Sequence, residues 1–131
     1  MLIIIRTTRR RYAVRHDDVA ALRVVARAED LHRQDVAGRP YVGVELGPLL
    51  DPADRSDAQR RHALIVPLRR RNVALLVDAV DTLIEHAAPQ PLPSLLRDRL
   101  RPPWAIGAVL INDQLVVQLD IREVARSALL L

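Results

Sequence analysis

Residues 62–80 read HALIVPLRRRNVALLVDAV, two apolar runs on either side of a charged tetrapeptide. Residues 63–66 and 73–77 are continuously apolar, and residues 69–72 between them read RRRN. Two short apolar runs joined by a polar turn predict a β-hairpin. Because neither run alternates with polar residues, we expect both strands to be buried on both faces. Residues 80–84 could extend the second strand.

The C-terminal third predicts a second hairpin followed by a helix. Residues 104–111 and 115–119 flank Asn112-Asp113, and both of these residue types tolerate the positive φ that a two-residue turn needs. Asp120 and Glu123 then form a D-x-x-E capping arrangement. The next apolar residues recur at helical spacing on one face: Ile121, Val124, Ala125, Ala128 and Leu129.

The N-terminal half predicts its secondary structure less clearly. Residues 2–5 and 12–14 predict strands joined by a turn at residues 9–11, and the alternation over residues 41–50 predicts a half-buried strand. Residues 17–34 allow two structures. Helix propensity favours a helix of four turns, whereas residues 22–25 also suit a strand after one helical turn.

The links between these segments are polar or rich in proline. Residues 51–61 predict a loop or a helical turn, and Ser94 could cap a short helix over residues 94–100. Short strands separated by turns, with one terminal helix, indicate an all-β fold of small barrels.

The length and composition suit one domain or two small intertwined subdomains, with no need of a disulfide. The chain has 131 residues, 50% of them hydrophobic, and it lacks Cys, which excludes disulfides, zinc-thiolate sites and cysteine nucleophiles. Residues 2–5 are too short for a signal-peptide core, and no apolar run reaches the roughly 18 residues of a membrane span. We expect a soluble, cytoplasmic protein.

No pattern in the sequence specifies a reaction. The four His residues form no pair at metal-ligand spacing, and Asp51, Asp54 and Asp57 do not match a calcium loop. Nucleophile-elbow and phosphate-loop motifs are absent. We therefore expect no enzyme, no metal and no cofactor.

Charge leaves one alternative open, a small basic β-barrel that binds nucleic acid. Net charge is +4, and every basic residue is Arg. The Arg residues are scattered among 16 acidic residues, however, and the only aromatic residues, Tyr12, Tyr41 and Trp104, are dispersed. A stacking platform beside a basic groove is not indicated, so nucleic acid is the less favoured partner.

Two segments resemble the CheW family of chemotaxis coupling proteins. Residues 73–80, VALLVDAV, are similar to that family's v-G-l-l-V-D-x-V, and residues 104–121 are similar to its ending y-l-x-G-v-x-x-x-d-g-x-l-v-l-l-L-D-l. The proline-rich link and residues 12–19 and 38–44 extend the resemblance over nearly the whole chain. Departures from the family pattern are Ala37 for its Arg, Ala74 for its Gly, and a shortened segment over residues 19–38.

The resemblance implies a fold of two packed, SH3-like, five-stranded barrels with a C-terminal helix. Residues 1–131 would then form a single domain of two intertwined subdomains, and residues 17–34 would hold a helical turn followed by a strand. The implied function is that of a non-enzymatic adaptor. Its partners would be the regulatory domain of a CheA-type histidine kinase and the cytoplasmic tip of a chemoreceptor, with no insertion into a membrane.

The resemblance also implies a receptor site in an apolar groove between the barrels. The matching positions in this chain are Ile3, Val19, Leu22 and Val80, with His16 where an apolar residue is usual. Each of the four could equally be an ordinary core residue.

Overall fold

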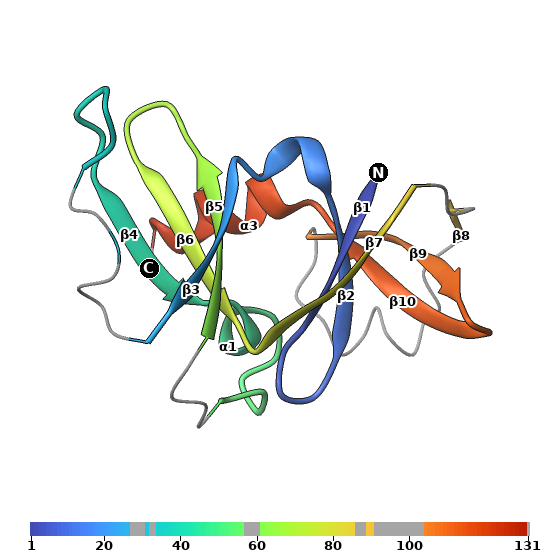
Figure 1. The fold of residues 1–131 in the computed structure, drawn as a ribbon. Helices are drawn as coiled ribbons and strands as arrows, with labels where there is room; N and C mark the ends of the chain where they lie inside the picture. Colours follow the sequence, from blue (N-terminus) through green and yellow to red (C-terminus); the bar gives the residue numbers. More distant parts are fainter. Residues whose placement is uncertain (27–30, 32–33, 57–60, 86–88, 91–103, 131) are drawn as a thin grey trace.

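The computed structural model describes residues 1–26, 31, 34–56, 61–85, 89–90 and 104–130, and shows two β-sheets and a C-terminal helix (Figure 1). The six-stranded sheet has the order β7 (Ala79–Ile84), β1 (Leu2–Arg6), β2 (Arg11–Arg15), β10 (Gln114–Leu119), β9 (Ala105–Ile111) and β8 (Pro89–Gln90). The four-stranded sheet has the order β3 (Ala21–Val25), β5 (Arg61–Pro67), β6 (Asn72–Val77) and β4 (Tyr41–Glu45). The predicted fold class is confirmed, although the strands divide as six and four.

The hairpin of residues 62–80 forms the centre of the four-stranded sheet. β5 and β6 pair antiparallel, with Leu64 opposite Leu75. Both strands are buried except for half-buried positions such as Leu76. Residues 80–84 do not extend β6. The chain leaves the sheet at Asp78 and enters the other sheet as β7, which is the edge strand beside β1.

Residues 17–34 could form either a long helix or a helical turn followed by a strand. The structure shows a 3₁₀ turn, His16–Asp18, followed by strand β3. The family resemblance implied this arrangement, and the four-turn helix favoured by propensity is wrong. β3 pairs along its whole length with β5. This long-range ladder outweighs the weak local preference for helix.

The strand predicted over residues 41–50 is wrong in its second half. β4 ends at Glu45, and Leu46–Leu50 form the short helix α1. Pro48 lies in the first turn of α1, where backbone N–H groups have no helical acceptor and a missing donor costs little. Leu46, Leu49 and Leu50 are buried at helical spacing.

The C-terminal prediction is confirmed. Asn112 and Asp113 have φ of 49° and 63° in the turn between β9 and β10. Helix α3 (Ile121–Ala128) is capped at its N-terminus by Asp120, whose Oδ1 accepts a hydrogen bond from the Glu123 amide at 3.3 Å. The helix predicted over residues 94–100 lies outside the described residues.

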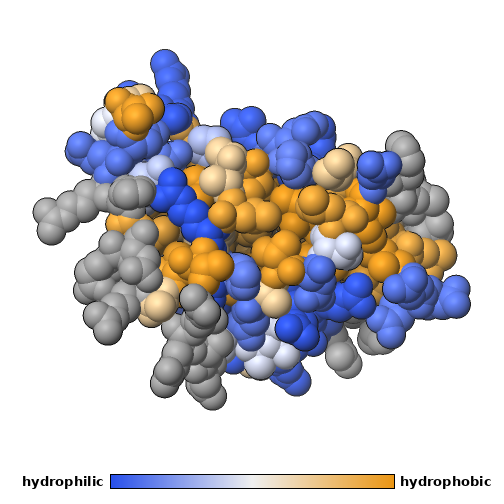
Figure 2. Space-filling view, viewed as in Figure 1, coloured by the Kyte–Doolittle hydropathy of each residue, from blue (hydrophilic) through white to orange (hydrophobic). Residues whose placement is uncertain are grey.

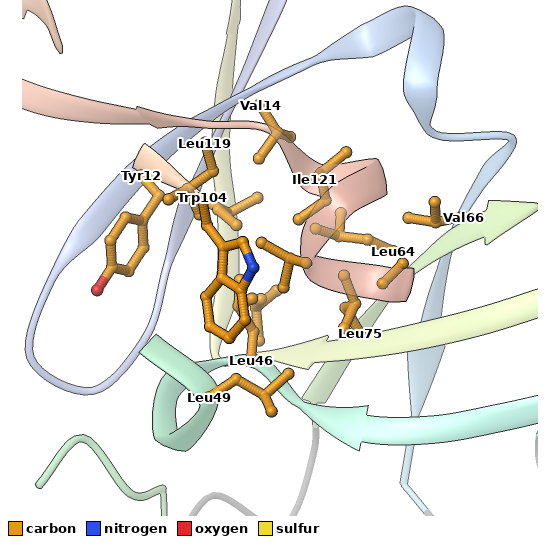
Figure 3. Packing of buried hydrophobic residues seen from close by; sticks show 14 of the residues in the cluster. Tyr12, Val14, Leu46, Leu49, Leu64, Val66, Leu75, Trp104, Leu119 and Ile121 are labelled. Atoms are coloured by element: carbon orange, nitrogen blue, oxygen red, sulfur yellow. The ribbon is translucent and has the colours of Figure 1, made fainter. Parts of the chain in front are cut away.

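The main core fills the space between the two sheets (Figure 3). It combines Tyr12 and Leu119 from the six-stranded sheet with Leu64 and Leu75 from the four-stranded sheet. Helix α3 follows β10 of one sheet but contacts β5 of the other. The helix and the core therefore join the two sheets.

Tyr12 has an unusual environment within this core. Its side chain is fully buried, and no described residue bonds its hydroxyl. Burial raises the pKa of Tyr12 well above its usual range. A buried hydroxyl without a partner costs free energy, so removing it should not weaken the fold.

We therefore expect Tyr12→Phe to leave the free energy of unfolding unchanged or to raise it by up to about 1 kcal/mol. Tyr12→Ala, which removes the ring, should cost about 3–5 kcal/mol. Urea denaturation measures both. A loss above about 1 kcal/mol for Tyr12→Phe would mean that the hydroxyl is hydrogen-bonded.

Candidate partner-binding site

The four predicted site residues divide into one core residue and three at or near the surface. Ile3 is only 1% exposed and belongs to the main core. Val19 and Val80 are half-buried and pack against that core. Leu22 is 44% exposed on β3. Ile3 therefore supports the site from beneath and offers little surface to a partner.

Strand pairing places Leu22 and Val80 on the side of the sheets that faces the main core, and Val19 packs against the same core. Residues opposite each other in antiparallel strands share a face. Leu22 lies opposite the core residue Leu64, and Val80 lies opposite Ile5, which is also in the core. Both β3 and β7 are edge strands. Their inward-facing side chains therefore border the core where no further strand covers it.

The same register adds two residues that the sequence did not identify. Val24, two positions after Leu22, is 49% exposed, and Leu83, opposite Ile3, is 52% exposed. We call the resulting surface the inter-sheet patch: Val19, Leu22, Val24, Val80 and Leu83. Figure 2 shows apolar side chains gathered across the middle of this side of the molecule. Val24 and Leu83 could be identified only once the pairing partners of β3 and β7 were known, because the sequence alone does not show which face of each strand they occupy.

The 3₁₀ turn positions Val19 at one end of the patch. The Val19 amide donates to the His16 carbonyl at 3.1 Å, and the Ala20 amide donates to Ile65 of β5 at 2.8 Å. The turn is thereby fixed to the four-stranded sheet. The His16 side chain itself is 52% exposed, with Nδ1 at 3.9 Å from the Asp17 carboxylate. It remains available to a partner.

A polar junction at Asp78 fixes the other side of the patch, where the chain passes between the sheets. Asp78 Oδ2 accepts from the Thr8 hydroxyl at 2.8 Å, and its amide donates to the Arg6 carbonyl at 2.9 Å. Arg61, whose side chain is 10% exposed, lies with Nη2 at 3.6 Å from Asp78 Oδ1 and also pairs with Glu45. These contacts set the start of β7, and so the position of Val80.

The loop that carries Ala37, where the family has Arg, is organised by one carboxylate. Asp35 accepts from the amides of Ala37 and Arg39 at 2.9 and 2.8 Å, and from the Asn72 side chain at 2.9 Å. Gly38 has φ of 83°, a conformation that favours glycine. The Asn72 bond, with the contacts to Arg39, lowers the pKa of Asp35 to about 2.

Acid should therefore weaken this loop. The pKa of Asp35 in the fold, about 2, lies below its ordinary value of 3.8, so its stabilisation is complete above about pH 4 and is lost as the pH falls towards 2. We expect Asp35→Ala to lower the melting temperature more at about pH 6 than at about pH 2.5. Thermal melts of both proteins at the two pH values measure this. If Asp35→Ala lowered the melting temperature equally at both pH values, the ionised Asp35 carboxylate would not be what stabilises this loop.

The aromatic residues take core or near-core positions. Tyr12 and Trp104 are buried, and the Trp104 indole donates to the Ser127 hydroxyl at 3.1 Å. Tyr41 is half-buried, with the Arg23 guanidinium 5.4 Å from the centre of its ring. Tyr12 and Trp104 are therefore too buried to stack on nucleic-acid bases, and Arg23 already occupies one side of the Tyr41 ring.

Comparisons with known proteins agree with this architecture. The sequence model of the CheW-like domain family matches residues 1–129. Among solved structures, the scaffolding protein TtCheW from Thermoanaerobacter tengcongensis superposes with a TM-score of 0.66 at 15% identity, over 91% of this chain and 87% of that chain. No curated protein matches the sequence. Within the described residues, no helix is long and apolar enough to cross a membrane.

Proposed function

Because the chain belongs to the CheW-like domain family, we propose that it is a non-enzymatic adaptor of chemosensory signalling. Its partners are the regulatory domain of a CheA-type histidine kinase and the cytoplasmic tip of a chemoreceptor. The likeness to a scaffolding protein, TtCheW, supports this role. An adaptor needs exposed surfaces that two partners can occupy, rather than a site for chemistry.

The proposal includes the domain organisation. Residues 1–131 form one domain whose two subdomains are intertwined. Two crossings support this organisation: the chain passes from the four-stranded to the six-stranded sheet at Asp78, and α3 returns from β10 to contact β5. The shared core supports it as well. The two sheets would then unfold together.

The inter-sheet patch is the observation that carries the proposal. Isolated exposed apolar side chains are normal on a protein surface, but a contiguous group beside two open strand edges indicates a binding surface. Leu22, Val24 and Leu83 are each about half exposed. Receptor tips are helical, and an apolar strip of this kind accepts the apolar face of a helix. The kinase regulatory domain binds a different surface.

We expect Leu22→Glu to weaken binding of the receptor fragment about 30-fold or more, because it places an unpaired charge at the centre of an apolar interface. Kinase binding should change less than about twofold. Since Leu22 is 44% exposed, the variant should keep its fold, with a change in unfolding free energy within about 0.5 kcal/mol. Calorimetric titrations with each partner, together with a melting curve, measure these effects.

Leu110→Glu is the matched control for this experiment. Leu110 is 51% exposed on β9 and lies outside the inter-sheet patch. The same substitution there should leave receptor binding within about twofold of wild type. Equal losses from the two variants would show that added negative charge, rather than the patch, controls receptor binding.

A further inference from the structure

A cleft outside the inter-sheet patch is lined by arginines. It lies between the turn that joins β1 to β2 and the first residues of β10, with a volume of about 370 Å³. Parallel pairing of β2 with β10 begins only at Tyr12 and Val117. The earlier parts of the two strands diverge, as Figure 1 shows. The cleft is lined by residues 6–11 of the turn and by Gln114, Leu115, Val116 and Val117 of β10.

The charged residues that line the cleft are all basic. They are Arg6, Arg9, Arg10 and Arg11. Four guanidinium groups on one short hairpin repel each other and raise the local positive potential. Clustering them around a concavity is costly unless something negative compensates.

Nearby carboxylates compensate only partly. Asp51 lies 3.6 Å from Arg10, and Asp81 lies 3.7 Å from Arg11 and 3.9 Å from Arg6. All three distances exceed hydrogen-bond length, and none of these acids lines the cleft.

The guanidinium donors are also largely unused. Within the described part of the chain, these four groups make a single hydrogen bond, from Arg11 Nη1 to Gln114 at 3.3 Å. The Nε atoms of Arg10 and Arg11 are buried without a hydrogen-bond partner, although Asp81 lies 3.7 Å from the Nε of Arg11. Buried charged donors are normally satisfied. An anion in the cleft would offer acceptors to the guanidinium groups that line it.

The turn that carries the arginines is held in place. The buried carboxylate of Asp54 accepts from the Thr7 hydroxyl and, at 3.1 Å, from the Arg9 amide. The Thr7 amide donates to the Arg10 carbonyl at 2.9 Å. The arginines are thus displayed from a fixed backbone, which lowers the entropy cost of binding a ligand.

We propose that this cleft binds a small anion that carries two or more phosphate groups. Arginine pairs with phosphate oxygens in a bidentate manner, and several guanidiniums around one concavity match several phosphoryl oxygens. The volume lies at the low end for small-molecule sites. Leu115 and Val117 on β10 provide an apolar wall beside the arginines. The site would allow a metabolite to bind the adaptor away from the inter-sheet patch.

Isothermal titration with inorganic pyrophosphate tests the proposal, with Arg9→Gln/Arg11→Gln as the cleft variant. Arg69→Gln/Arg70→Gln is the matched control, because it removes the same charge from exposed residues at the β5–β6 turn. We expect the cleft variant to bind pyrophosphate at least about tenfold more weakly, and the control to change less than about twofold. Circular dichroism should show both variants folded.

A nucleoside diphosphate forms the second arm of the experiment. Affinity equal to that of pyrophosphate would assign recognition to the phosphates alone, and tighter binding would add contacts to Leu115 and Val117. Both results support the site. Binding by neither ligand, equal binding of sulfate at matched ionic strength, equal loss in the control variant, or tighter binding of a single-stranded oligonucleotide would each overturn it.

Discussion

Replacing Leu75 by alanine is expected to destabilise the protein by about 2–5 kcal/mol. Leu75 is fully buried, lies opposite Leu64 on β5 and Val44 on β4, and belongs to the core that joins the two sheets. Its own strand, β6, is hydrogen-bonded to β5 on one side and to β4 on the other, so the backbone cannot collapse into the space that the missing side chain leaves. The cost therefore combines lost burial with an unfilled cavity.

Urea denaturation of Leu75→Ala measures this loss. Leu130→Ala is a matched control, because Leu130 is 87% exposed and its truncation should change stability by less than about 0.5 kcal/mol. Arg70→Ala, at the exposed β5–β6 turn, should also have an effect below about 0.5 kcal/mol. If Leu75→Ala cost no more than these controls, the placement of the hairpin in the core would be wrong.

Arg61→Met is expected to cost about 3 kcal/mol, because it removes a largely buried cation from its two carboxylate partners. Arg61 pairs with Glu45 and Asp78, and its Nη2 donates to the Leu76 carbonyl at 3.3 Å. Methionine keeps much of the aliphatic bulk, so the loss reports mainly the uncompensated carboxylates. Asp78, whose side chain is 20% exposed, would be left with little solvent to replace its partner.

A double-mutant cycle separates the ion pair from the rest of this effect. Asp78→Asn removes the negative charge while keeping the shape of the side chain. If the two residues interact as described, the double variant should be more stable than the sum of the single losses predicts, by about 1 kcal/mol or more. Simple additivity would show that Arg61 acts through Glu45 and its packing alone.

Much of the fold could be predicted from local sequence. The hairpin over residues 62–80 and the turn at Asn112-Asp113 were predicted because apolar runs and turn residues carry their own backbone preferences. Helix α3 was predicted because its cap and its apolar face lie within one short segment. These features need no information about distant residues.

Features that depend on distant residues were missed or left open. Strand β3 forms because β5 lies beside it, and local propensity alone favoured a helix there. The change of sheet at Asp78 separates β7 from β6, although residues 80–84 could extend the second strand on sequence grounds.

The candidate site, too, depends on contacts between residues that are distant in the sequence. Val19, Leu22 and Val80 were named through the family resemblance, and the structure places them at or near the surface beside the core. Ile3 is core because β2 and β7 flank its strand on both sides. Val24 and Leu83 joined the site only when the register of β3 and β7 was known, because exposure depends on which strands end a sheet.

The central claim is that this protein links a receptor to a kinase. The most direct measurement mixes the purified protein with a CheA-type kinase regulatory domain and a chemoreceptor cytoplasmic fragment from the same genome, and follows complex formation by size-exclusion chromatography with light scattering. We expect binary complexes with each partner and a ternary complex that contains all three, because the proposal assigns the two partners to different surfaces. Binding to neither partner, at concentrations up to about 100 μM (a dissociation free energy below about 5.5 kcal/mol), would contradict it.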